Sequence, residues 1–170
     1  MSFYLVDSKP IPLCKPIRHG RVRLLRDDRA YFGKTHAGWF FGFKLHLLRN
    51  AAGFIVDAIL TPANYDDRGP ALEMAQCVDG GIMLGDLGYS GPHLSGLLED
   101  ESEMLMITRA DAPEKKKLLN SVRQPIETTL SQLWRKFVDR VFSRSWQGLW
   151  NMIRLKLIDF NLRRSGIISA

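Results

Sequence analysis

The sequence is poor in cysteine and has no long apolar run. Its 170 residues contain only two cysteines, Cys14 and Cys77. They match no metal-ligand spacing, so we expect free thiols in a reducing compartment. No apolar run approaches the roughly 18 residues that a membrane helix needs, and the first residues have neither the basic nor the long apolar segment of a secretory signal. These absences predict a cytoplasmic protein without a membrane partner.

The charge of the chain is positive and unevenly distributed. The net charge is +6, with seven Lys or Arg against two acids between Lys9 and Arg29 and eight against two between Arg135 and Arg164. Residues 57–111, by contrast, are acidic. Basic ends around an acidic centre are typical of proteins whose ends contact phosphates and whose centre holds cations. This pattern predicts a nucleic-acid partner.

The hydrophobic pattern predicts one domain, residues 1–170, of the α/β class. Its sheet is mixed, with three antiparallel strands first and parallel additions later, and helices flank it. This order of elements is also that of a ribonuclease H-like fold. The expected strands are 3–6, 39–49, 54–60, 81–85 and 103–107, and the expected helices are 70–78, 92–98, one from 118 onward and 146–162.

Three further features of the first half carry structural predictions. Pro10, Pro12 and Pro16 predict that the first strand ends near residue 7, because proline lacks an N–H and restricts the residue before it. The basic stretch Arg18–Gly38 has little periodicity and is predicted to be a long mobile loop. His46, on a strand face without a spaced partner, is predicted to be structural.

Asp66 and Asp67 form a pair of neighbouring carboxylates before the first expected helix. Such residues are favoured as helix N-caps because their side chains accept hydrogen bonds from backbone N–H groups. Capping is therefore the simpler interpretation, although extra metal ligands are the alternative.

The stretch Gly80–Tyr89 is the centre of the predicted site. It holds a short apolar strand that ends at Asp86, between Gly85 and Gly88. Open α/β sheets bind their ligands at the carboxyl ends of such strands. A turn-forming aspartate is the alternative interpretation of Asp86. Asp7 also follows a short apolar strand, so it occupies the equivalent place.

Glu127, on the long helix after the last strand, is the candidate for a third carboxylate. Three such side chains can hold two divalent cations about 4 Å apart, and all-oxygen sites favour Mg²⁺ or Mn²⁺ over zinc. One metal would activate the attacking water or 3′-hydroxyl, and the other would stabilise the leaving oxygen. The expected chemistry is metal-dependent phosphoryl transfer.

Three stretches of the chain resemble the DDE transposases of bacterial insertion sequences: Tyr4–Pro10, Gly85–Tyr89 and Arg123–Glu127. The resemblance implies that Asp7, Asp86 and Glu127 are the metal-binding catalytic triad. It also implies that Arg123 contacts DNA phosphate or supports Glu127. The implied reaction is hydrolysis at transposon ends followed by transfer of the 3′-hydroxyl into target DNA. The implied partners are those two DNAs, and a homodimer is left open.

The chain departs from the family pattern in its last stretch. The signature's Tyr and Lys fall on Asn120 and Trp134. Pro125 is expected at the first helical position, where its missing N–H is harmless, so Arg123 and Glu127 are not expected to share a helix face.

The family's N-terminal DNA-binding region is expected to be absent, since almost nothing precedes Asp7. Two alternatives to an active transposase domain stay open. One is an inactive remnant that binds DNA through its basic ends, and the other is a stand-alone ribonuclease H-like nuclease.

Overall fold

The structure is a computed structural model that describes residues 2–21, 25, 30–35, 37–108, 110–111, 116–137, 143 and 145–168. Within the long helix it describes the side chains of 121 and 124–133 only. The chain divides into two compact units. Unit 1 comprises Met1–Ser8, His46–Ile59 and Asp66–Leu130, and unit 2 comprises Lys9–Leu45, Leu60–Tyr65 and Ser131–Ala170.

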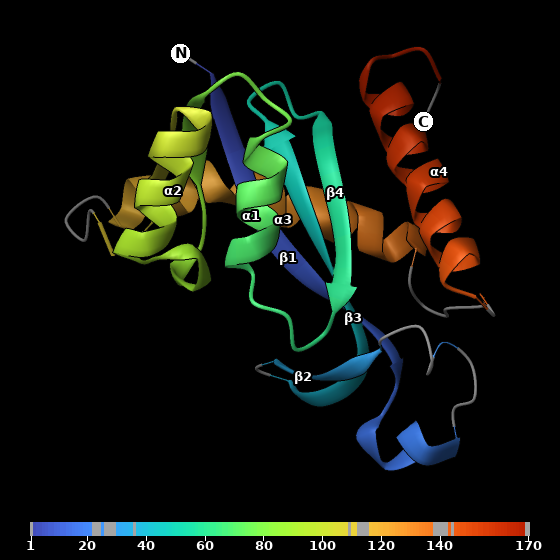
Figure 1. The fold of residues 1–170 in the computed structure, drawn as a ribbon. Coiled ribbons are helices and arrows are strands. Elements are labelled where there is room, and N and C mark those ends of the chain that lie inside the picture. The colour runs from blue at the N-terminus through green and yellow to red at the C-terminus, as the bar shows by residue number, and fades with distance from the viewer. Residues whose placement is uncertain are drawn as a thin grey trace. The chain divides into compact units, whose positions relative to one another are not determined.

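The architecture is mixed α/β, with helices flanking a mixed sheet (Figure 1). The strands are β1 (Phe3–Cys14), β2 (Tyr31–Thr35), β3 (Gly38–Asn50), β4 (Ile55–Pro62), β5 (Gly81–Leu84) and β6 (Met104–Ile107). The helices are η1 (Pro16–Arg21), α1 (Arg68–Ala75), η2 (Leu87–Tyr89), α2 (Pro92–Ser102), α3 (Lys116–Phe137) and α4 (Trp146–Arg164).

The sheet has both antiparallel and parallel pairs. Its order is β2-β3-β1-β5-β6, and β4 also pairs with β3. β5 is parallel to β1 and to β6, whereas β2 and β3 are antiparallel. The turn between β3 and β4 is too short for a parallel crossover; there the Asn50 side chain accepts a hydrogen bond from the Phe54 N–H at 2.9 Å. The predicted hairpin of residues 39–49 and 54–60 is thus confirmed.

The prediction that β1 ends near Asp7 is wrong, because β1 continues to Cys14 through Pro10 and Pro12. Its pairing with β5 covers only Phe3–Leu5. Beyond that point β1 has β3 as its neighbour in the sheet order. Proline is tolerated in a strand where the missing N–H faces an unpaired edge.

The stretch Arg18–Gly38 contains regular structure, which contradicts its prediction as a loop. η1 occupies its beginning, and β2 pairs with β3 from Tyr31↔Gly42 to Thr35↔Gly38. Strand formation here depends on the partner strand, since two paired strands satisfy each other's backbone groups. Residues 22–24, 26–29 and 36 lie outside the described part of the chain.

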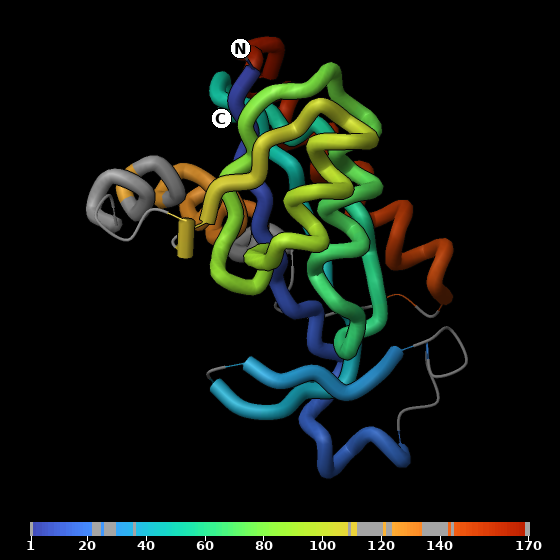
Figure 2. The backbone as a smooth tube through the Cα atoms, turned by 60° about the vertical axis from the view of Figure 1, so that its left-hand side comes forward, coloured from blue at the N-terminus to red at the C-terminus, as the bar shows by residue number. Residues whose placement is uncertain are grey.

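The core of unit 1 lies between β1, β5 and β6 and the helices α1 and α2. Figures 1 and 2 show these two helices side by side on one face of the strands, and Figure 1 shows α3 behind the strands. Ile126 and Leu130 of α3 are buried. The buried apolar cluster comprises Val6, Leu48, Ala71, Met74, Ala75, Met83, Tyr89, Leu94, Leu98, Met104 and Met106.

Unit 2 has an aromatic core of its own. Phe32 and Phe41 face each other across β2 and β3 with ring centroids 5.2 Å apart, and Phe43 meets Trp146 of α4 at 5.1 Å. α4 begins at Ser145, whose side chain accepts a hydrogen bond from the Gly148 N–H as an N-cap. No described helix is long and apolar enough to cross a membrane.

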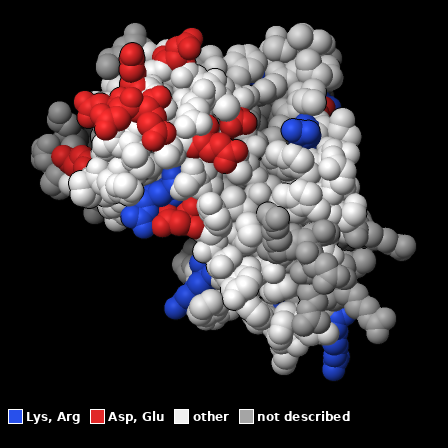
Figure 3. Space-filling view, viewed as in Figure 1, with Lys and Arg blue, Asp and Glu red and all other residues white. Residues whose placement is uncertain are grey.

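Acidic side chains gather on the outer side of α1 and α2 (Figure 3). We call the exposed residues Glu73, Glu99, Asp100 and Glu101 the outer carboxylates. They explain much of the acidic character of the middle of the sequence. An exposed carboxylate keeps its water and costs little free energy.

Candidate active site

Asp7 and Asp86 lie at the same level of two adjacent parallel strands. In the register of β1 and β5, Leu5 is opposite Leu84, and each aspartate follows its leucine by two residues. Both side chains are half-buried. The sheet therefore brings two acids together that are far apart in the sequence, at the edge where open α/β sheets place ligands.

Each of these two aspartates is fixed by its own backbone surroundings. Asp7 Oδ1 accepts a hydrogen bond of 2.8 Å from the backbone N–H of Ser8. Asp86 precedes η2, and its carbonyl accepts a 2.9 Å hydrogen bond from the Tyr89 N–H. The chain thus turns sharply directly after β5, and this turn holds Asp86 at the sheet edge.

The glycine before Asp86 is required by packing. A Cβ at Gly85 would lie 2.9 Å from atoms of the Tyr89 side chain, which is closer than real side chains pack. Tyr89 itself is 1% exposed. The Gly-Asp-Leu-Gly-Tyr stretch is therefore a compact turn in which the Tyr89 side chain folds back against Gly85.

The buried Tyr89 hydroxyl lies within the electrostatic influence of three carboxylates. Burial is the largest reason that the pKa of Tyr89 lies well above its ordinary value of 10.0. The negative charges of Asp67, Asp7 and Asp86 raise this pKa further, whereas the Ser8 hydroxyl lowers it. Among the described residues the Tyr89 hydroxyl makes no hydrogen bond of ordinary geometry. The charges of Asp67, Asp7 and Asp86 therefore all act on one buried hydroxyl.

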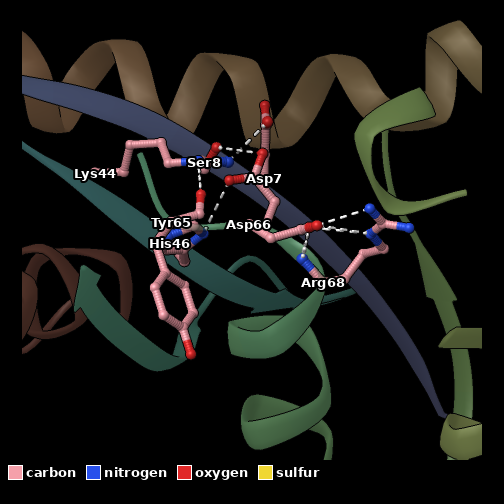
Figure 4. Close-up of polar contacts among 8 residues, drawn as sticks. Asp7, Ser8, Lys44, His46, Tyr65, Asp66 and Arg68 are labelled. Carbon is pink, nitrogen blue, oxygen red and sulfur yellow. Dashed lines mark hydrogen bonds and ion pairs between the residues drawn. The ribbon is translucent and has the colours of Figure 1, made fainter. Parts of the chain in front are cut away.

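Asp67 is the site residue that the capping interpretation missed. It is the N-cap of α1, but its side chain makes no capping hydrogen bond. Its Oδ2 instead accepts a 3.3 Å hydrogen bond from the Ser8 hydroxyl, and its Oδ1 lies 3.8 Å from Nδ1 of the fully buried His46 (Figure 4).

Asp66, and not Asp67, accepts the backbone hydrogen bond that the capping interpretation predicts at the start of α1. Its Oδ1 accepts a 3.0 Å hydrogen bond from the Arg68 N–H, and its carboxylate pairs with the Arg68 guanidinium at 2.7 Å (Figure 4). The capping prediction is therefore correct for the type of residue and wrong for Asp67. A sequence signal for a second role of Asp67 was available: two neighbouring acids stand at a helix start, where one is enough for capping.

Glu127 lies on α3, and Pro125 lies inside that helix rather than at its first position. The prediction about Pro125 is therefore wrong. The helix continues through the proline, and burial of Ile126, Leu130 and Leu133 after it helps to offset an interior proline's cost of about 3 kcal/mol. The Thr129 hydroxyl donates a 2.9 Å hydrogen bond to the Pro125 carbonyl, an interaction that tends to bend helices.

Glu127 is exposed, although its neighbour Ile126 is fully buried. It is not one of the carboxylates that raise the pKa of Tyr89. The backbone of Arg123 lies one helical turn before Glu127, so the expectation that the two do not share a helix face is also wrong. The Arg123 side chain lies outside the described residues.

The donor set at the sheet edge fits a hard divalent cation. Asp7 and Asp86 supply carboxylate oxygens only, which suits Mg²⁺ or Mn²⁺. The buried Tyr89 hydroxyl beside them is a polar group without a described partner. In the described part of the chain, no three His, Cys, Asp or Glu side chains lie close enough together to form a complete metal site.

Comparison with known proteins agrees with the sequence resemblance. The family model described as "Transposase DDE domain" matches residues 1–143, which include all three of the stretches that carry the resemblance. No curated protein matches the chain.

Proposed function

The chain belongs to the transposase DDE domain family, and we propose that Asp7, Asp86 and Glu127 are its metal-binding catalytic triad. Membership makes the protein a transposase and a polynucleotidyl transferase. The observation that carries the assignment is the register of β1 and β5, which brings Asp7 beside Asp86. The proposed ligands of Mg²⁺ or Mn²⁺ are these two carboxylates, completed by Glu127.

A ribonuclease H-like fold is part of this proposal. The order β4-β3-β1-β5-β6 supports it, since β1 stands at the centre with β3 and β4 on one side and the parallel strands β5 and β6 on the other. In this arrangement β2 is an addition beside β3. We also propose that residues 1–170 act as one catalytic domain.

The residues of the site have distinct roles in phosphoryl transfer. When bound, the two metal ions would polarise the scissile phosphate and lower the pKa of the attacking hydroxyl. Asp7 and Asp86 hold their carboxylates at a rigid sheet edge, which keeps reorganisation small. Arg123, one turn before Glu127 in α3, contacts a DNA phosphate. The substrates are the transposon ends and the target DNA, and the basic segments Lys9–Arg29 and Arg135–Arg164 bind their backbones.

The test combines Mn²⁺ titration with cleavage of a DNA duplex. We expect wild-type protein to bind Mn²⁺ calorimetrically and to cut DNA only when Mg²⁺ or Mn²⁺ is present. Asp86→Asn should lose both properties, whereas Asp100→Asn, an exposed outer carboxylate, should keep both.

Two results would overturn this function. Salt-dependent DNA binding without any metal-dependent cutting would identify an inactive remnant. Preferential cutting of RNA–DNA hybrids would identify a ribonuclease H-like nuclease instead. Mn²⁺ binding that is unchanged in Asp86→Asn would refute the site assignment itself.

A further inference from the structure

Ser8 connects two carboxylates that come from different elements. Its backbone N–H donates to Asp7 Oδ1 at 2.8 Å. Its side-chain hydroxyl donates to Asp67 Oδ2 at 3.3 Å (Figure 4). One residue therefore links the carboxylate at the start of α1 to the carboxylate on β1.

His46 is the buried neighbour of the Asp67 carboxylate. It is fully buried on β3, between the buried residues Leu45 and Leu47, and its Nδ1 lies 3.8 Å from Asp67 Oδ1. The Asp67 side chain keeps 24% of its surface exposed. The distance between Nδ1 and Oδ1 is longer than a hydrogen bond, so the imidazole limits the rotation of the carboxylate by packing beside it.

Asp67 is available for this arrangement because it does not cap α1. Asp66 accepts the hydrogen bond from the Arg68 N–H, while the N-cap Asp67 makes no such bond. A Cβ at Gly88 would lie 3.6 Å from Asp67 Oδ2, so the turn after Asp86 also passes close to this side chain. Asp67 thus lies close to Ser8, the residue after Asp7, and to Gly88 in the turn after Asp86.

From these contacts we infer that Asp67 is a positioning residue, which holds Asp7 in its metal-binding orientation through the Ser8 hydroxyl and is itself held by His46. This inference rests on the proposed function of Asp7. Groups that hydrogen-bond to metal ligands, or orient them, typically contribute tenfold to a hundredfold in metal affinity or activity. Asp67 acts here through Ser8 and not as a ligand.

A double-mutant cycle on Mn²⁺ affinity tests the inference. Ser8→Ala and Asp67→Ala should each raise the Kd for Mn²⁺ by about tenfold. The double variant should bind no more weakly than Asp67→Ala, because both changes break one connection. Ser8→Thr, which restores a hydroxyl, should recover most of the affinity, and Asp66→Ala should bind Mn²⁺ like wild type. Urea unfolding of each variant separates loss of affinity from loss of fold.

The outcomes distinguish this inference from the function on which it rests. Wild-type Mn²⁺ affinity in Ser8→Ala would overturn it. So would losses that multiply in the double variant, since Asp67 would then act independently of Ser8. If Asp86→Asn also kept its affinity, the proposed function would fail together with it.

Discussion

Unit 1 contains two groups of carboxylates that differ in surroundings rather than in charge. The outer carboxylates on α1 and α2 are exposed to water. The site carboxylates, Asp7, Asp67 and Asp86, converge on a buried tyrosine hydroxyl and raise its pKa. Charge density along the sequence is high around the outer carboxylates and low around Asp7 and Asp86, so it does not mark the site. A shared effect on a buried polar atom does mark the site, because charges around such an atom lose water and have like-charged neighbours.

The largest expected difference between the two groups is in catalysis. Asp7→Asn should lower the rate of DNA cleavage by roughly a thousandfold or more, since a metal ion supplies several kcal/mol of transition-state stabilisation and each 1.36 kcal/mol is tenfold. Glu99→Gln, which removes the same charge from α2, should leave the rate unchanged. Single-turnover cleavage assays measure both. If both variants lost the same share of the cleavage rate, the distinction between the site carboxylates and the outer carboxylates would be wrong.

Pro125→Ala should show whether Glu127 belongs with the site carboxylates. The substitution restores an N–H inside α3, so the free energy of unfolding should rise by about 2 kcal/mol, because the cost of an interior proline is partly offset by the lower entropy that it gives the unfolded chain. Urea denaturation measures this change.

Gln124→Ala, at an exposed neighbouring position, is the matched control for Pro125→Ala and should alter stability by less than about 0.5 kcal/mol. If Glu127 acts with Asp7 and Asp86, Pro125→Ala also changes the cleavage rate. An unchanged rate in a stabilised protein would separate Glu127 from the site.

Tyr89→Phe removes the hydroxyl on which the site carboxylates converge. A buried hydroxyl without a hydrogen bond costs about 1 kcal/mol, so the metal-free variant should be more stable by that amount. Tyr65→Phe, at a residue that is 51% exposed, should change little. A variant that is less stable than wild type would mean that the hydroxyl is satisfied in the folded protein.

Alkaline unfolding tests the same hydroxyl by a second route. The folded pKa of Tyr89 lies well above 10.0. A tyrosine in the unfolded chain ionises near pH 10. Above that pH the unfolded chain releases a proton that the folded chain keeps, so the free energy of unfolding falls as pH rises. Tyr89→Phe should lack this part of the decline.

The smallest effect is expected from the outer carboxylates as a group. Replacing Glu73, Glu99 and Asp100 by their amides together should change the free energy of unfolding by no more than about 0.5 kcal/mol per site. Mn²⁺ affinity should stay at the wild-type value. A marked loss of affinity would mean that long-range charge, and not the local geometry around Tyr89, attracts the cation.

Much of the fold could be predicted because it follows local patterns. The β3–β4 hairpin and the helices α1, α2 and α4 came from periodicity and turn residues, which act over a few neighbouring positions. β2 was missed because its five residues become a strand only beside β3. The continuation of β1 through Pro10 and the interior position of Pro125 were missed for a related reason: pairing and burial outweighed a local penalty.

The sequence by itself determined the chemistry of this protein: the carboxylates at Asp7 and Asp86, the glycines around the second of them and the resemblance that named a DDE transposase. Residue types and short-range order are sufficient for these conclusions, since a metal site needs particular atoms. The tertiary structure alone decided which acids meet. It placed Asp7 beside Asp86 through strand register, assigned capping to Asp66, and turned Asp67 toward Ser8 and His46. Contacts between residues 59 positions apart, such as Ser8 and Asp67, depend on packing that no local pattern encodes.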